Sequence, residues 1–118
     1  MSSTTTKVLV DLVKKLEEKN VKVLVNGKIK DESRIYHNFD LIIMGNKTLC
    51  IDILENLTLK KLIEILAKAL DLGPFAEIYA LINRKHCEKI QFNTTKFKTI
   101  YYDDISDLPK LLTSIVNN

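Results

Sequence analysis

Two aspartates lie inside otherwise apolar stretches of the chain, where a charged side chain needs an explanation. Asp40 belongs to the apolar residues 39–44, and Asp52 to the apolar residues 49–54. Between them, the Gly-Asn-Lys sequence at residues 45–47 predicts a tight turn with positive φ angles, and therefore an antiparallel hairpin. Because the start of one strand then lies beside the end of the next, the two carboxylates are expected to be neighbours. Such a pair at the edge of an apolar sheet is typical of a site for a hard divalent cation.

Each candidate residue also has a structural interpretation that involves no catalytic or binding role. Asp40 could cap a turn at the start of its strand, whereas Asp52 has isoleucine on both sides and points away from them, which favours a site. His37 could contact a substrate, although a surface position is the default for it and for His86. Several basic residues in polar segments could contact a phosphate backbone or form an ordinary solvated surface. They are Lys28, Lys30, Arg34, Lys85 and Lys89.

The composition fits one globular domain over residues 1–118, with residues 1–6 expected to be flexible. The chain is 46% hydrophobic and 28% charged, which excludes a disordered protein. Its net charge of +3 permits a nucleic-acid partner without arguing for one. Charges interrupt every apolar run and no signal sequence is visible, so we expect a cytoplasmic protein without a membrane span. No glycine lies in a glycine-rich loop, so no nucleotide cofactor is expected.

The two cysteines, Cys50 and Cys87, lack the paired spacing of zinc ligands and are most simply buried or half-buried thiols. A disulfide between them is expected only in the cytosol of a hyperthermophile. Many lysines together with many isoleucines and leucines are typical of thermophile proteins.

In the first half of the chain, apolar periodicity predicts a helix, a strand and the central hairpin. The helix should begin at Thr5 or Thr6 and end at Asn20, and a strand at residues 21–25 should end at Asn26 and Gly27. Residues 28–38 are either a loop or the continuation of a hairpin. The buried face of the helix is expected to hold Leu9, Leu12, Val13 and Leu16. The unbroken apolar runs of the hairpin predict strands that are covered on both faces.

The second half predicts two more strands, each followed or preceded by a helix. A helix capped by Thr58 should end at Gly73 and Pro74, and a strand at residues 76–82 should run parallel to the strand before it. Residues 89–98 fit a short helix or a short strand, and a strand follows at residues 99–102. The inner stripe of the second helix is expected to hold Leu59, Leu62, Ile63, Leu66, Ala67 and Leu70, with Lys60, Lys61, Glu64 and Lys68 outside. A last helix is expected to have Ser106 as its cap and Leu108, Leu111, Leu112 and Ile115 as its apolar face.

This order predicts an α/β fold, a mixed sheet of about five strands with helices on both faces. With the aspartate pair on the central hairpin, the layout resembles the restriction-endonuclease-like PD-(D/E)XK nuclease superfamily, and within it the archaeal Holliday-junction resolvases and Mrr-type domains. Phe39-Asp40 stands at the first motif, and Asp52-Ile53-Leu54 stands at the second motif, (Asp/Glu)-x-Lys. Residues 100–109 are similar to the strand, aspartate and helix that end many of these domains.

The resemblance implies a DNA-associated endonuclease that forms a homodimer and uses Mg²⁺ or Mn²⁺. It implies that Asp40 and Asp52 are catalytic and hold the metal, with the backbone carbonyl of Ile53 as a further ligand. The family also has an acid on its first helix, which would be Asp11 or Glu17, and Glu17 is the one expected to point inward.

Leu54 departs from the family pattern, because a lysine is expected at this position. Leucine can neither carry charge nor donate a hydrogen bond to a phosphate. Lys60 or Lys61, at the start of the next helix, is the nearest replacement that the sequence offers. The sequence therefore favours a weak or inactive metal-dependent endonuclease. The alternative is a non-catalytic structural or regulatory protein-interaction module on the same scaffold.

Overall fold

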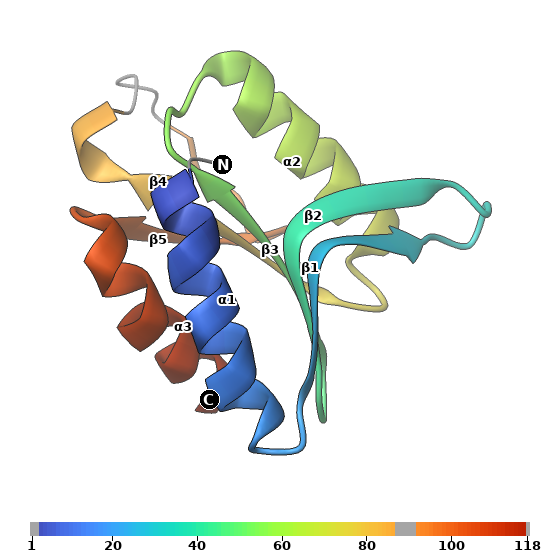
Figure 1. Ribbon diagram of the computed structural model, residues 1–118. Coiled ribbons are helices and arrows are strands. Elements are labelled where there is room, and N and C mark those ends of the chain that lie inside the picture. The colour runs from blue at the N-terminus through green and yellow to red at the C-terminus, as the bar shows by residue number, and fades with distance from the viewer. Residues whose placement is uncertain (1–2, 87–91, 118) are drawn as a thin grey trace.

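A computed structural model describes residues 3–86 and 92–117 and shows one mixed sheet between two layers of helices (Figure 1). The helices are α1 (Ser3–Glu17), α2 (Leu59–Leu72) and α3 (Leu108–Asn117), with short 3₁₀ turns at Arg84–His86 and Ile105–Asp107. The strands are β1 (Lys22–Lys30), β2 (Tyr36–Met44), β3 (Thr48–Leu54), β4 (Glu77–Asn83) and β5 (Lys98–Tyr102). Helices α1 and α3 cover one face of the sheet, and α2 covers the other (Figure 1).

The strands lie in the sheet in the order of the chain, β1-β2-β3-β4-β5. The first three are antiparallel neighbours, whereas β3, β4 and β5 run parallel. Antiparallel strands can be joined by short turns, but the parallel pair β3 and β4 needs a crossover, which α2 supplies. The predicted α/β fold, a mixed sheet of five strands with helices on both faces, is confirmed.

The unbroken apolar runs of the central strands are buried on both faces, as predicted. Along β2, Leu41 and Ile43 pack on the side of α1 and α3, whereas Ile42 between them packs under α2. The same alternation places Ile51 with the first group and Cys50 with the second. Since neighbouring strand residues point to opposite faces, a strand with helices on both sides needs apolar residues at every position.

Several predicted boundaries are wrong by a few residues. Helix α1 begins at Ser3 rather than at Thr5 or Thr6, so four of the six residues expected to be flexible are helical. Asn20 follows the end of the helix in the left-handed conformation, with φ 63°. The 3₁₀ turn before α3 is capped by Asp104 rather than Ser106, because the Asp104 carboxylate accepts the Ser106 N–H and the Asp104 N–H donates to the Asp107 carboxylate.

Residues 92–98 and the turn at residues 45–47 also differ in part from the predictions. Residues 89–91 lie outside the described residues, and so does Cys87. Residues 92–97 form neither a helix nor a strand, and β5 starts at Lys98. The turn at residues 45–47 joins β2 to β3 as predicted, yet neither Gly45 nor Asn46 has a positive φ.

The inner stripe predicted for α2 is only partly confirmed: Leu62 is buried and Leu66 partly buried, whereas Ala67 is exposed. Leu59, Ile63 and Leu70 were placed inside, but each is more than half exposed. The buried residues of the helix are Leu62, Ile65, Ala69 and Leu72. Helix α2 is apolar on two sides, so periodicity alone did not distinguish the side that packs on the sheet from the side that faces solvent.

Strands β1 and β2 extend beyond the rest of the sheet as a bent hairpin (Figure 1). The prediction that Asn26 and Gly27 end the first strand is wrong, because β1 continues to Lys30. Residues 28–38 therefore continue a hairpin, the second of the two predicted alternatives. Asn26 has φ 52°, and the pair opposite Asp40 is missing from the ladder between β1 and β2. We call residues 27–39, beyond this bend, the arm.

Candidate functional site

The two aspartates lie where the arm separates from β3. The ladder between β2 and β3 has Leu41 opposite Ile51 as its last pair, and side chains replace the backbone bonds beyond it. The Asp40 N–H donates to Asp52 Oδ1 (3.3 Å), and the Ile53 N–H donates to Asp40 Oδ2 (2.7 Å). The predicted proximity of the carboxylates is therefore present. We call the place where Asp40 and Asp52 meet, between the separating strands β2 and β3, the fork.

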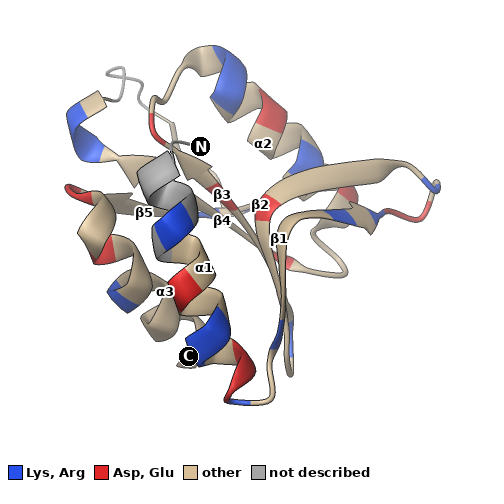
Figure 2. Cartoon of the chain, in the orientation of Figure 1, with Lys and Arg blue, Asp and Glu red and all other residues tan. Residues whose placement is uncertain are grey.

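Lys68 of α2, the covering helix, contacts Asp52. Its ammonium donates to Asp52 Oδ2 (2.8 Å) and to the Asn38 carbonyl of the arm (2.6 Å). The same nitrogen lies 4.6 Å from the centre of the Phe39 ring, at a distance that allows a cation–π contact. Lys68 therefore connects β3, the arm and α2 at one point. Figure 2 shows acidic positions on β2 and β3 close to a helix that carries several basic ones.

These groups line a hollow of about 450 Å³. Lys28 of the arm and the amides Asn26 and Asn38 supply the rest of its polar lining. Asn26 occupies the bend of β1, and its positive φ is a conformation that asparagine tolerates better than most residues. The bend thus places an amide and a lysine opposite the carboxylates.

The carboxylates are in an environment that opposes their charge. Burial raises the pKa of Asp40, and the negative charge of Asp52 adds to this, while the hydrogen bond from the Ile53 N–H acts in the opposite direction. Asp52 is only 9% exposed. Lys68 pairs with Asp52, whereas burial opposes the charge of Asp40, and a bound cation would stabilise the charged form of both carboxylates. Carboxylate oxygens are the ligands that Mg²⁺ and Mn²⁺ prefer, so the residues present fit such an ion.

Other residues predicted for the site lie elsewhere. Glu17 was expected to point inward, but it is exposed in the last turn of α1, and Asp11 is exposed as well. Lys60 is exposed and Lys61 half-buried in the first turn of α2, and Lys68 makes the contact that they were expected to make. For Ile53 the recorded contact is its N–H, so a role of its carbonyl as a ligand stays a prediction.

Sequence reasoning missed Lys68 because it assigned this lysine to the solvated side of α2. The signal that could have found it is spacing. Positions seven residues apart lie on nearly the same side of a helix, so Lys68 lies about two turns beyond Lys61 on that side. The side chain of Lys68 is only 24% exposed, which a purely solvated lysine would not be.

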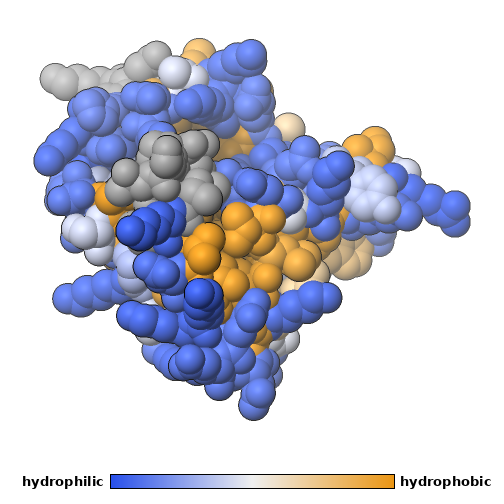
Figure 3. All heavy atoms as spheres, in the orientation of Figure 1, coloured by the Kyte–Doolittle hydropathy of each residue, from blue (hydrophilic) through white to orange (hydrophobic). Residues whose placement is uncertain are grey.

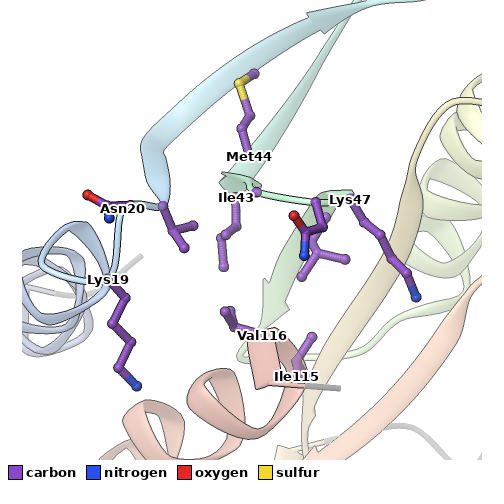
Figure 4. Close-up of a pocket in the computed structure, with 11 residues that line it drawn as sticks. Lys19, Asn20, Ile43, Met44, Lys47, Ile115 and Val116 are labelled. Atoms are coloured by element: carbon purple, nitrogen blue, oxygen red, sulfur yellow. The ribbon is translucent and has the colours of Figure 1, made fainter.

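A larger hollow of about 630 Å³ lies at the other end of the sheet (Figure 4). Its walls come from the end of α1, the turn between β2 and β3, and the end of α3. Lys19 and Lys47 lie on opposite sides of this hollow, whose lining also includes Ile43 and Ile115 (Figure 4). Its described lining holds no carboxylate, histidine or cysteine, so it lacks the groups that the fork brings together.

Apolar side chains also reach the surface in the hollow between α1 and the bent hairpin (Figure 3). Val13, Val21 and Val25 are partly buried against the core on this side of the sheet, and Val10 is 43% exposed. Within residues 3–86 and 92–117, no helix has the length and apolar character needed to cross a bilayer.

Comparison with known proteins leaves the family open. No protein-family model matches the chain, and no curated protein matches it significantly. A crystal structure described as that of protein of unknown function AF1548 is similar over 89% of this chain, with a TM-score of 0.44 and 14% sequence identity. The chain spans about half the length of that protein, 51%. A likeness this low carries no argument about function.

Proposed function

We propose that this chain is a DNA-associated protein of the PD-(D/E)XK nuclease type, a weak Mg²⁺- or Mn²⁺-dependent endonuclease whose motif lysine has moved from position 54 to Lys68. The observation that supports the proposal is the ammonium of Lys68 at 2.8 Å from Asp52 Oδ2, on the side of the sheet that α2 covers. The missing lysine was the main argument against activity, and Lys68 supplies the required charge from another element.

Each residue of the fork has a distinct role in this proposal. Asp40 and Asp52 supply the carboxylate oxygens that hold the cation, which when bound polarises the phosphate and activates a water molecule. Lys68 faces the same hollow, where its ammonium can bind a phosphate oxygen and stabilise the charge that develops on it. Lys28 and the amides Asn26 and Asn38 can contact neighbouring phosphates or sugars, which positions a strand without reading its sequence.

The test is a cleavage assay with Mg²⁺ and with Mn²⁺ on single-stranded, duplex and four-way-junction DNA. Asp52→Asn and Lys68→Met are each expected to reduce the rate by at least about 100-fold, a typical effect of removing one group that stabilises transition-state charge. Lys60→Met is the matched control, because Lys60 is an exposed lysine of the same helix and should leave the rate unchanged.

Two results would contradict this assignment. Equal losses in Lys60→Met and Lys68→Met would show that the lysine of the site was misidentified. No cleavage of any substrate by the unmodified chain would remove the catalytic proposal. Binding of Mn²⁺, followed by electron paramagnetic resonance with and without Asp52→Asn, would then show whether the fork still holds a metal.

A second candidate function is a protein-interaction module, and the exposed side of α2 favours it. Leu59, Ile63 and Leu70 form one stripe along the helix, and Phe75 just beyond it is also about half exposed. Exposed apolar side chains along one side of a helix are typical of protein contacts. We propose a second copy of the chain as the occupant, since a homodimer can bury the same stripe on both subunits.

The dimer proposal is tested by the molar mass in solution, measured by light scattering during gel filtration. The unmodified chain is expected to elute as a dimer, and Ile63→Glu as a monomer. Glu64→Gln is the control, because Glu64 is an exposed neighbour whose charge is not needed for an apolar contact. A monomeric unmodified chain would contradict the proposal, and so would a dimer that Ile63→Glu leaves intact.

A further inference from the structure

Away from the fork, three ligating side chains from three elements meet at the tip of the arm. Asp31 follows the end of β1, His37 lies on β2, and Asp71 lies in the last turn of α2. His37 Nε2 is 2.9 Å from Asp31 Oδ2 and 3.5 Å from Asp71 Oδ2. One ligand atom from each residue lies within 4.8 Å of the other two. We call these residues the arm–helix cluster.

Asp31 is oriented by its own turn. Its Oδ1 accepts the Ser33 hydroxyl (2.7 Å) and the Ile35 N–H (3.1 Å), which leaves Oδ2 to face His37. Outer-sphere hydrogen bonds that hold one carboxylate oxygen in place are a common support of metal ligands.

The charges of the cluster are not balanced by its own groups. Within the part of the chain that the structure describes, His37 is the only ion-pair partner recorded for Asp31 and for Asp71. An imidazole nitrogen carries at most one proton, yet two carboxylate oxygens approach the same nitrogen of His37. A divalent cation would balance both carboxylates and bind the unprotonated nitrogen, and one nitrogen with two oxygens is a donor set that suits Zn²⁺ and related transition ions.

We propose that Asp31, His37 and Asp71 form a second metal site, which binds a divalent transition ion of the Zn²⁺ class and fastens the arm to α2. The site differs in chemistry from the fork, whose side-chain ligands are all oxygen. Asp71 lies three residues after Lys68 on the same helix, and His37 lies beside Asn38 on the arm. A metal in the cluster therefore holds together the two elements between which Lys68 contacts the Asn38 carbonyl.

The test is titration of the full chain with Co²⁺, which reports its ligands by visible absorption, and with Zn²⁺ by calorimetry. Excess Mg²⁺ is added in both titrations to saturate the oxygen site proposed at the fork, and Cys87→Ser removes a thiol next to His86 in the sequence. His37→Gln and Asp71→Asn are the test variants. Their controls are His86→Gln, at an exposed histidine, and Glu64→Gln, at an exposed acid of the same helix as Asp71. Asp71 is itself exposed, so its variant should fold even if His37→Gln does not.

One equivalent of metal is expected to bind and to raise the melting temperature. Loss of a direct ligand should weaken binding by more than the roughly 10–100-fold effect typical of an outer-shell partner. The two controls should bind as the unmodified chain does. Absence of stoichiometric binding would overturn the proposal, as would binding that survives Asp71→Asn or that disappears in His86→Gln. None of these outcomes depends on whether the fork cleaves DNA.

Discussion

Removing the charge of Lys68 should destabilise the fold even in the absence of metal and DNA. In Lys68→Met the side chain keeps its apolar stem but no longer pairs with Asp52, which is only 12% exposed in its side chain. Removing one partner of a fully buried pair costs about 3–5 kcal/mol, and an exposed pair contributes about 0–1 kcal/mol. Because Lys68 is 24% exposed, we expect the free energy of unfolding to fall by about 2–3 kcal/mol.

Urea denaturation in the presence of a chelator measures this loss directly. For a chain of this size, about 2–3 kcal/mol corresponds to a decrease in melting temperature of about 8–12 °C. Lys60→Met should stay within about 0.5 kcal/mol of the unmodified chain, as surface substitutions usually do. Asp52→Asn keeps an oxygen that can accept the Asp40 N–H. In a double-mutant cycle with Lys68→Met, we expect a coupling free energy between Asp52 and Lys68 of about 2 kcal/mol.

The reasoning fails if Lys68→Met and Lys60→Met destabilise the chain equally, or if the cycle shows no coupling between Lys68 and Asp52. Either result would mean that the ammonium is solvated in the free protein rather than paired at the fork. The role proposed for Lys68 in binding phosphate would then lose its structural basis.

Three further predictions concern stability. The pKa of Asp40 is raised in the folded state, so the folded state binds the proton more tightly than the unfolded state does. The free energy of unfolding without metal should therefore fall as the pH rises from the ordinary pKa of an aspartate through the raised pKa. Asp40→Asn should flatten this dependence in melting curves recorded from pH 4 to 8; an unchanged slope would contradict the assignment. Gly27→Ala should cost about 1–3 kcal/mol in urea denaturation, because an added Cβ would lie 2.9 Å from Ile42 Cδ1 and Leu24 Cβ. Thr58→Ala should cost about 1 kcal/mol, since Thr58 Oγ1 accepts the Lys61 N–H at the start of α2, and its loss should also appear in helical circular dichroism.

The parts of the fold that the sequence predicted are those that local pattern determines. Unbroken apolar runs at residues 41–43 and 49–51 required strands with cover on both faces, and the short turn between them required an antiparallel pair. A helix between β3 and β4 required a parallel crossover. The same local pattern placed Asp40 and Asp52 opposite each other, because a register follows from the length of the turn.

The errors concern features that depend on the partners of an element. Both sides of α2 carry apolar residues, and the side with Leu62 and Ile65 is buried because it meets Cys50 and Ile78 of the sheet. The stripe with Leu59 and Ile63 is equally apolar but has no such partner within the described residues. Periodicity identifies stripes on a helix, and only the packed structure decides which of two stripes is buried.

The position of the lysine has the same physical explanation. Asp52 points to the face of the sheet that α2 covers, as do Cys50 and Leu54. Any lysine on the sheet-facing side of α2 could therefore approach it, and periodicity treats Lys61 and Lys68 as equivalent. The arm decides between them, because the Phe39 ring and the Asn38 carbonyl contact the ammonium only at the position of Lys68. Leucine at position 54 is then consistent with the proposed site: its side chain packs under α2, and the charge that the site needs comes from the helix above it.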